Sequence, residues 1–116
     1  MEGINELRDV VEKVLLEWTD YITPKIAPSE NVTKAEVIFD RTNDRYVLFD
    51  VGWHGKRRIH SLIAHLDIID GKIWIQEDNT EEGVALDLEK AGVPKDKIVL
   101  GFKSAFLRQF TDYAAA

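Results

Sequence analysis

The residues best equipped for chemistry lie in one short segment, residues 53–60, which read Trp-His-Gly-Lys-Arg-Arg-Ile-His. The segment holds three adjacent cations, two histidines and no acid, although the whole chain carries a formal net charge of −6. Guanidinium and ammonium groups bind phosphates and carboxylates, and an indole ring adds a flat apolar contact. This segment is therefore the first place to look for a binding partner.

Histidine is a common metal ligand, so His54, His60 and His65 raise the question of a metal site. In a regular strand, side chains alternate between the two faces of a sheet, so residues 60 and 65 point in opposite directions. His54 falls in a turn, and a shared site would need a bulge or a second chain. The chain has no cysteine, and the spacing matches no zinc signature. We expect no metal and no cofactor, with His65 hydrogen-bonded within the fold and His60 on the surface.

The carboxylates are numerous enough for hydrolysis but are not arranged for it. A nuclease of the restriction-endonuclease type needs an acid, then an acid and a lysine two residues apart. After Asp67, the nearest match is Glu-Asp-Asn at residues 77–79, which lacks the lysine. The sequence has neither a phosphate-binding Gly-Lys-Ser/Thr loop nor a Gly-x-Ser-x-Gly elbow. We expect no catalytic residues and no enzymatic activity.

Three interpretations of the basic segment stay open: a solvated turn, a contact with another protein, or a contact with DNA phosphates. The acidic balance of the chain opposes broad affinity for nucleic acid, because non-specific DNA binding depends on cations that neutralise phosphates. Residues 77–89 contain six acids and no cation, and offer a counterpart within one molecule or across a homodimer. The candidate partner-binding residues are Trp53, His54, Lys56, Arg57, Arg58 and His60.

An amphipathic helix and a set of strands must position this segment. Apolar residues recur at three- and four-residue intervals from Ile4 to Ile22 and predict a helix, which the prolines of a connection at 23–32 end. Alternating or β-branched runs predict four antiparallel strands, with turns at 42–44 and at Asp70-Gly71. The predicted strands cover residues 35–40, 46–53, 58–69 and 73–76.

The last third of the chain predicts a second helix and a short strand. Asp78, with Glu81 at capping-box spacing, indicates the start of the helix, and Gly92 indicates its end. Residues 98–100 predict a fifth strand, whereas 102–116 fit either a helix or a docked extended tail. The expected fold class is α+β over a single domain, 1–116. Its N-terminal amphipathic helix packs on an antiparallel β-meander of about four strands, followed by the second helix and the short strand.

The composition bounds the class of protein. A chain of 116 residues, 45% hydrophobic and 31% charged, is typical of one soluble domain. Because it has no apolar run long enough to cross a membrane and no visible signal peptide, we expect a cytoplasmic protein.

An ordered series of motifs runs through nearly the whole chain: YVLFDVGW at 46–53, RRIH at 57–60, HLDI at 65–68, DGKIWIQ at 70–76, DNTE at 78–81, GVA at 83–85, GVPKD at 92–96 and IVLGF at 98–102. Arg108 and Phe110-Thr111 continue it. In these motifs the chain resembles the XisI family, the fdxN element excision controlling factors of cyanobacteria.

The resemblance implies a small non-catalytic accessory protein. Such a protein acts with a companion, XisH, in developmentally regulated excision of a DNA element by a separate recombinase. XisH resembles nuclease-fold proteins, which implies that XisI-like chains restrain or position such a partner. We expect contact with a XisH-like protein through the sheet face and residues 53–60. The recombinase and a second copy of the chain are further candidate partners. Direct DNA binding through residues 56–58 is the alternative function.

Overall fold

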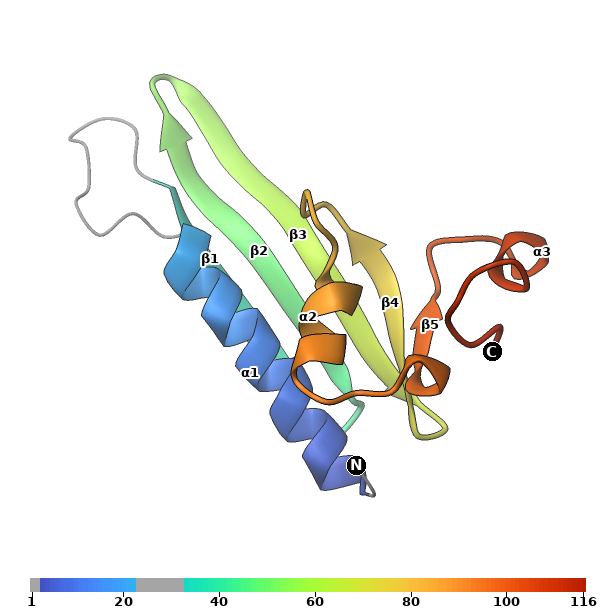
Figure 1. The fold of residues 1–116 in the computed structure, drawn as a ribbon. Helices are drawn as coiled ribbons and strands as arrows, with labels where there is room; N and C mark the ends of the chain where they lie inside the picture. The colour runs from blue at the N-terminus through green and yellow to red at the C-terminus, as the bar shows by residue number, and fades with distance from the viewer. Residues whose placement is uncertain (1–2, 23–32) are drawn as a thin grey trace.

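The computed structural model describes residues 3–22 and 33–116, which form a sheet of five strands with the two longer helices on one face (Figure 1). The elements are α1 (Ile4–Ile22), β1 (Thr33–Asp40), β2 (Arg45–His54), β3 (Arg57–Ile69), β4 (Lys72–Asp78), α2 (Val84–Lys90), the short 3-10 helix η1 (Lys95–Lys97), β5 (Ile98–Leu100) and α3 (Ala105–Arg108). Strands β1 to β4 form an antiparallel meander, and β5 pairs with β4 in parallel. The predicted α+β fold is confirmed.

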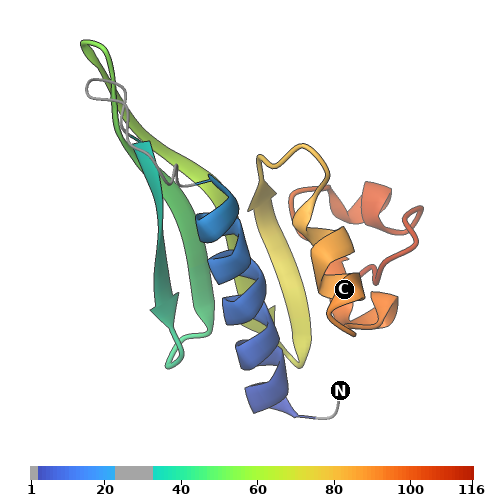
Figure 2. The same ribbon diagram turned by 60° about the vertical axis from the view of Figure 1, so that its left-hand side comes forward.

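Helix α1 spans the residues that the apolar periodicity predicted. Its buried side chains, Leu7, Val11, Val14 and Leu15, recur at three- and four-residue intervals and join the core. In Figure 2, α1 lies across the sheet on the same side as α2. Within the described residues, no helix is both long and apolar enough to cross a membrane. The predicted connection at 23–32 lies outside the described residues.

Tight turns join the central strands and fix their register. Asp70 and Gly71 form the loop between β3 and β4, with φ of 51° and 75°. Positive φ at both loop residues is the pattern of a type I′ turn, whose twist matches that of the strands, as the Asp-Gly pair predicted. Between β2 and β3 the loop is Gly55-Lys56, and only the glycine has a positive φ, 63°. That pattern fits a type II′ turn.

Helix α2 begins later than we expected. Asp78 ends β4, and the helix starts at Val84 after Gly83, without the capping box that Asp78 and Glu81 predicted. One oxygen of Asp78 accepts a hydrogen bond from the amide of Thr80, at 2.9 Å. The other accepts from the amide of Val84, at 2.8 Å. Asp78 therefore still accepts from the first amide of α2, although it lies six residues before that amide rather than at the cap position.

The end of α2 follows the prediction. Gly92 has a φ of 101°, and its amide and that of Val93 donate to the carbonyls of Glu89 and Leu88. These two bonds define a Schellman motif, in which glycine takes the left-handed position at no steric cost. The predicted fifth strand is also present, as β5.

Residues 102–116 combine the two predicted alternatives. Helix α3 is a single turn, and the hydroxyl of Ser104 accepts a hydrogen bond from the amide of Leu107 at its start. Turns and bends follow at 109–113, and Ala114 then docks the tail on β5 through a single parallel bridge with Val99. Phe106 and Phe110 remain 66% and 71% exposed. The phenylalanine spacing therefore does not mark a core helix.

Candidate partner-binding surface

The hairpin formed by β2 and β3 projects beyond the end of α1 and carries the basic segment at its tip (Figures 1 and 2). Residues 53–58 are all exposed. In the part of the chain that the structure describes, no carboxylate forms an ion pair with Lys56, Arg57 or Arg58. The sequence-predicted residues are thus available to a partner.

Two of these residues form a cross-strand pair. Trp53 lies opposite Arg58, whose guanidinium carbon sits 5.2 Å from the centre of the indole ring. This is a cation–π contact, and it holds a half-exposed tryptophan and an arginine as one unit. Arg57 pairs with His54 and therefore points to the other side of the sheet, as alternation predicted.

The Trp53–Arg58 pair belongs to the sheet face opposite α1 and α2, which we call the open face. Tyr46 and Leu48 of β2 are fully buried on the helix side, so the alternate residues of β2 point away from the helices. The open face over β1, β2 and β3 includes Lys34, Glu36, Ile38, Val47, Phe49, Val51, Trp53, Arg58, His60, Leu62 and His65. Ile38 is 59% exposed and Trp53 48% exposed. Its apolar side chains form a strip along β2, with the Lys34–Glu36 ion pair beside it on β1 and the cation Arg58 at the hairpin end.

A β-bulge overturns one expectation about the histidines. Ile63 is an extra residue in β3, because Leu48 of β2 pairs with Ala64 and the next residue, Phe49, pairs with Leu62. His60 pairs with Val51 and His65 with Val47, and both histidines therefore lie on the open face rather than on opposite faces. Four residues of β2 separate the two positions, roughly 13 Å along the strand. Among the described residues, no three potential ligands gather into a metal site.

The two histidines have different surroundings. His65 is held in the fold, with its Nε2 at 2.8 Å from Oδ1 of Asp67. The second carboxylate oxygen of Asp67 accepts a hydrogen bond from the side-chain amide of Gln76. His60 is exposed and lies against the ring of Phe49, with centroids 5.9 Å apart. The predicted roles of His65 and His60 are confirmed. Only His60 is placed to meet a partner.

The C-terminal segment covers the other end of the same sheet face. The guanidinium of Arg108 lies 5.1 Å from the centre of the Trp74 ring. It also donates to the carbonyl of Lys103 at 2.9 Å, a bond within the segment that holds the guanidinium in place over the ring. The uncovered part of the face therefore runs from the middle of β1, β2 and β3 to the hairpin tip.

Asp50 lies at the base of the hairpin, on the helix side. It pairs with Ala35 of β1 and Ser61 of β3, and its Oδ1 is buried without a hydrogen-bond partner. Burial raises the pKa of the Asp50 carboxyl, and a backbone hydrogen bond from Val51 only partly opposes the shift. Asp50 thus weakens the base of the hairpin at neutral pH.

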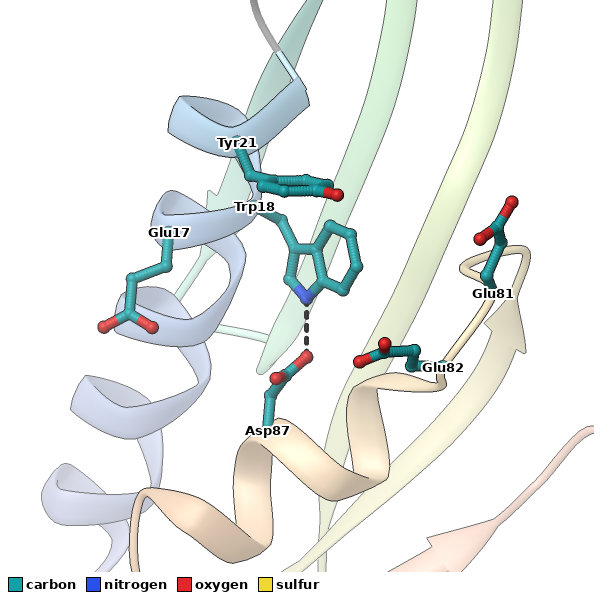
Figure 3. A pocket seen from close by; sticks show the side chains of 6 residues that line it. All are labelled: Glu17, Trp18, Tyr21, Glu81, Glu82 and Asp87. Carbon is teal, nitrogen blue, oxygen red and sulfur yellow. Dashed lines mark hydrogen bonds between the residues drawn. The ribbon is translucent and has the colours of Figure 1, made fainter.

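The acidic residues 77–89 do not meet the basic segment within one molecule; instead, part of this stretch faces α1 (Figure 3). A cavity of about 540 Å³ lies between α1, the loop before α2, and α2. We call it the acidic pocket; its lining residues are Glu17, Trp18, Tyr21, Glu81, Glu82 and Asp87. Sequence reasoning missed this pocket. The only available signal was an indole within the apolar stripe of the N-terminal helix.

The comparisons agree with this fold over its whole length. The family described as XisI protein matches residues 1–115. The crystal structure of a XisI-like protein from Anabaena variabilis ATCC 29413 is 32% identical, with a TM-score of 0.85, and covers 98% of this chain and 100% of that one. The fdxN element excision controlling factor XisI from the same organism is 29% identical, with a TM-score of 0.77 and 97% of each chain covered. No protein of curated function matches the chain.

Proposed function

The chain belongs to the XisI family, and we propose that it serves as an accessory controlling factor in the site-specific excision of a DNA element. It acts through contact with a XisH-like companion and contributes no catalytic group, because a separate recombinase cuts and joins the strands. Full-length similarity to a solved protein named as an fdxN element excision controlling factor supports this role. We infer that the chain restrains or positions its XisH-like companion.

The single observation that carries the contact role is the Trp53–Arg58 pair on the open face. Tryptophan and arginine are the residues most enriched at energetic centres of protein interfaces. Trp53 is 48% exposed at one end of an apolar strip, although burial of its ring would be favourable. An exposed apolar strip next to a projecting cation has the composition of an interface that awaits a partner. His60 lies on the same face and would extend the contact along β3.

Direct DNA binding by Lys56, Arg57 and Arg58 is the weaker alternative. The three cations do not form one phosphate-binding row, because Arg57 points to the helix side and Arg58 is stacked on Trp53. The rest of the molecule, with its net charge of −6, repels a polyanion. A protein surface therefore fits the open face better than a phosphate backbone.

An excision assay tests the proposal. The host carries the element, its recombinase and the XisH-like companion but lacks this chain, and the excised junction is measured by quantitative PCR. Wild-type chain should restore excision, whereas the double variant Trp53→Ala/Arg58→Ala should not. Leu86→Ala is the matched control, because Leu86 is 46% exposed but lies on α2, on the other side of the sheet. Excision at wild-type level with the double variant, at equal protein abundance, would contradict the proposal.

A further inference from the structure

The acidic pocket is rich in carboxylates. Four of its six lining residues are carboxylates: Glu17, Glu81, Glu82 and Asp87. They come from α1, from the loop before α2 and from α2 itself, and none of the described residues that line the cavity is a lysine or arginine. Two of the four already have partners, because Glu17 lies 4.0 Å from the ammonium of Lys13 and Asp87 accepts a hydrogen bond from Trp18. Glu81 and Glu82 are the two carboxylates of the loop before α2, and they offer negative charge to a basic group.

Two aromatic rings complete the site, and they distinguish it from a simple acidic surface. Trp18 and Tyr21 meet edge to face, with centroids 5.5 Å apart and ring planes at 86°. The indole N–H of Trp18 already donates to Asp87 at 2.7 Å, which fixes the ring at the floor of the pocket (Figure 3). Tyr21 is 82% exposed. Aromatic faces beside carboxylates are the surroundings that a guanidinium or ammonium group prefers.

The chain itself supplies a matching cation donor. Lys56 and Arg57 lie at the tip of the projecting hairpin, both exposed and without an ion-pair carboxylate among the described residues. Arg57 points to the helix side of the sheet, the side on which the pocket lies. The tip cannot fill the pocket of its own molecule, because it projects away from α2 (Figures 1 and 2).

We propose that the hairpin tip of one copy docks into the acidic pocket of a second copy, with Lys56 and Arg57 against Glu81 and Glu82. In a two-fold arrangement each copy gives its tip and receives the tip of the other, so that the assembly closes as a dimer. Because side chains alternate along the strands, the two faces of the hairpin bind different partners. Arg57 faces the second copy, while Trp53 and Arg58 stay on the open face for the companion.

Charge reversal provides the test. The pocket variant is Glu81→Lys/Glu82→Lys, and the tip variant is Lys56→Glu/Arg57→Glu; all four side chains belong to exposed residues, so the fold should be retained. The mass of the particle in solution is measured by light scattering and by sedimentation over a range of protein concentrations. Wild type should be a dimer that weakens as salt rises. Each variant alone should raise the dissociation constant of the dimer roughly tenfold or more.

An equimolar mixture of the two variants is the decisive arm. In the mixed dimer, the acidic tip of the tip variant meets the basic pocket of the pocket variant. At the other contact, the unchanged basic tip meets the unchanged acidic pocket. The mixture should therefore regain the wild-type affinity, and so should one chain that carries all four substitutions. Lys90→Glu, an exposed substitution on α2 outside the pocket lining, should leave the dimer unchanged.

Three results would overturn the inference: a monomeric wild type, a dimer that neither variant weakens, or a mixture that stays monomeric. A monomeric wild type whose pocket binds a basic segment of the companion would assign the pocket to another occupant. Failure here is separable from failure of the proposed function. Trp53→Ala leaves the tip cations and the pocket intact, so it should weaken binding of the companion without changing the dimer.

Discussion

Removal of the Trp53 side chain should weaken binding to the companion far more than it weakens the fold. A tryptophan buries up to about 250 Å², and 48% of this one is exposed in the free chain. Roughly 120 Å² is therefore left for a partner to cover, worth about 3 kcal/mol at 25 cal/mol per Å². At 1.4 kcal/mol for each factor of ten, Trp53→Ala should raise the dissociation constant about 100-fold.

The cost to the free chain is smaller, because the substitution removes a partly exposed ring and one cation–π contact with Arg58. That contact is worth about 0.5–1 kcal/mol at an exposed site. Titration calorimetry with the purified companion measures the affinity, and thermal unfolding measures the stability. Phe106→Ala is the matched control, because this aromatic residue is 66% exposed but lies on α3. Companion affinity within about threefold of wild type for Trp53→Ala would refute the reasoning.

Three further predictions concern the fold that holds the hairpin. The raised pKa of Asp50 means that its contribution to stability is full below the ordinary carboxyl value of 3.8 and is lost as the pH rises through the raised value. Asp50→Asn should therefore unfold at higher urea concentration than wild type at pH 7, with the difference shrinking in acid; a constant difference would contradict the assignment. Tyr46→Phe removes a hydrogen bond to Asp44, 3.1 Å long, and should cost about 0.5–1.5 kcal/mol in the same assay, whereas an unchanged midpoint would show that the bond contributes nothing. Gly101→Ala would place a methyl group 2.7 Å from Oε1 of Gln76 and 3.1 Å from a backbone oxygen of β4. It should cost about 1–3 kcal/mol, and a wild-type melting temperature would show that β4 and β5 yield easily.

The sequence predicts most of the fold because its strongest signals are local. The apolar period of Ile4–Ile22 defines the helix to the residue, and Asp70-Gly71 defines the turn between β3 and β4. Where the prediction is wrong, the determinant is not local. The bulge at Ile63 depends on how β3 pairs with β2, and it alone moves His65 to the face of His60.

The late start of α2 and the acidic pocket have the same explanation. Asp78 looks like a helix cap in sequence, but the strand pairing of β4 extends through it, so it can cap only from a distance. The pocket joins Trp18 to Asp87 across 69 residues of chain, a contact that no spacing rule reveals. Among the candidate binding residues, exposure and alternation were predictable for Arg57 and Arg58 because a regular hairpin obeys the two-residue period.

The central claim is that this chain regulates excision through a protein contact rather than through DNA. The most direct test measures two binding isotherms under the same conditions, one with the purified XisH-like companion and one with duplex DNA from the element end, from low salt to about 0.15 M. The account predicts saturable binding of the companion that persists across this range and no binding of DNA even at low salt. It would be contradicted if the companion failed to bind, while DNA bound at low salt and lost affinity with a log–log slope near one for each phosphate contact.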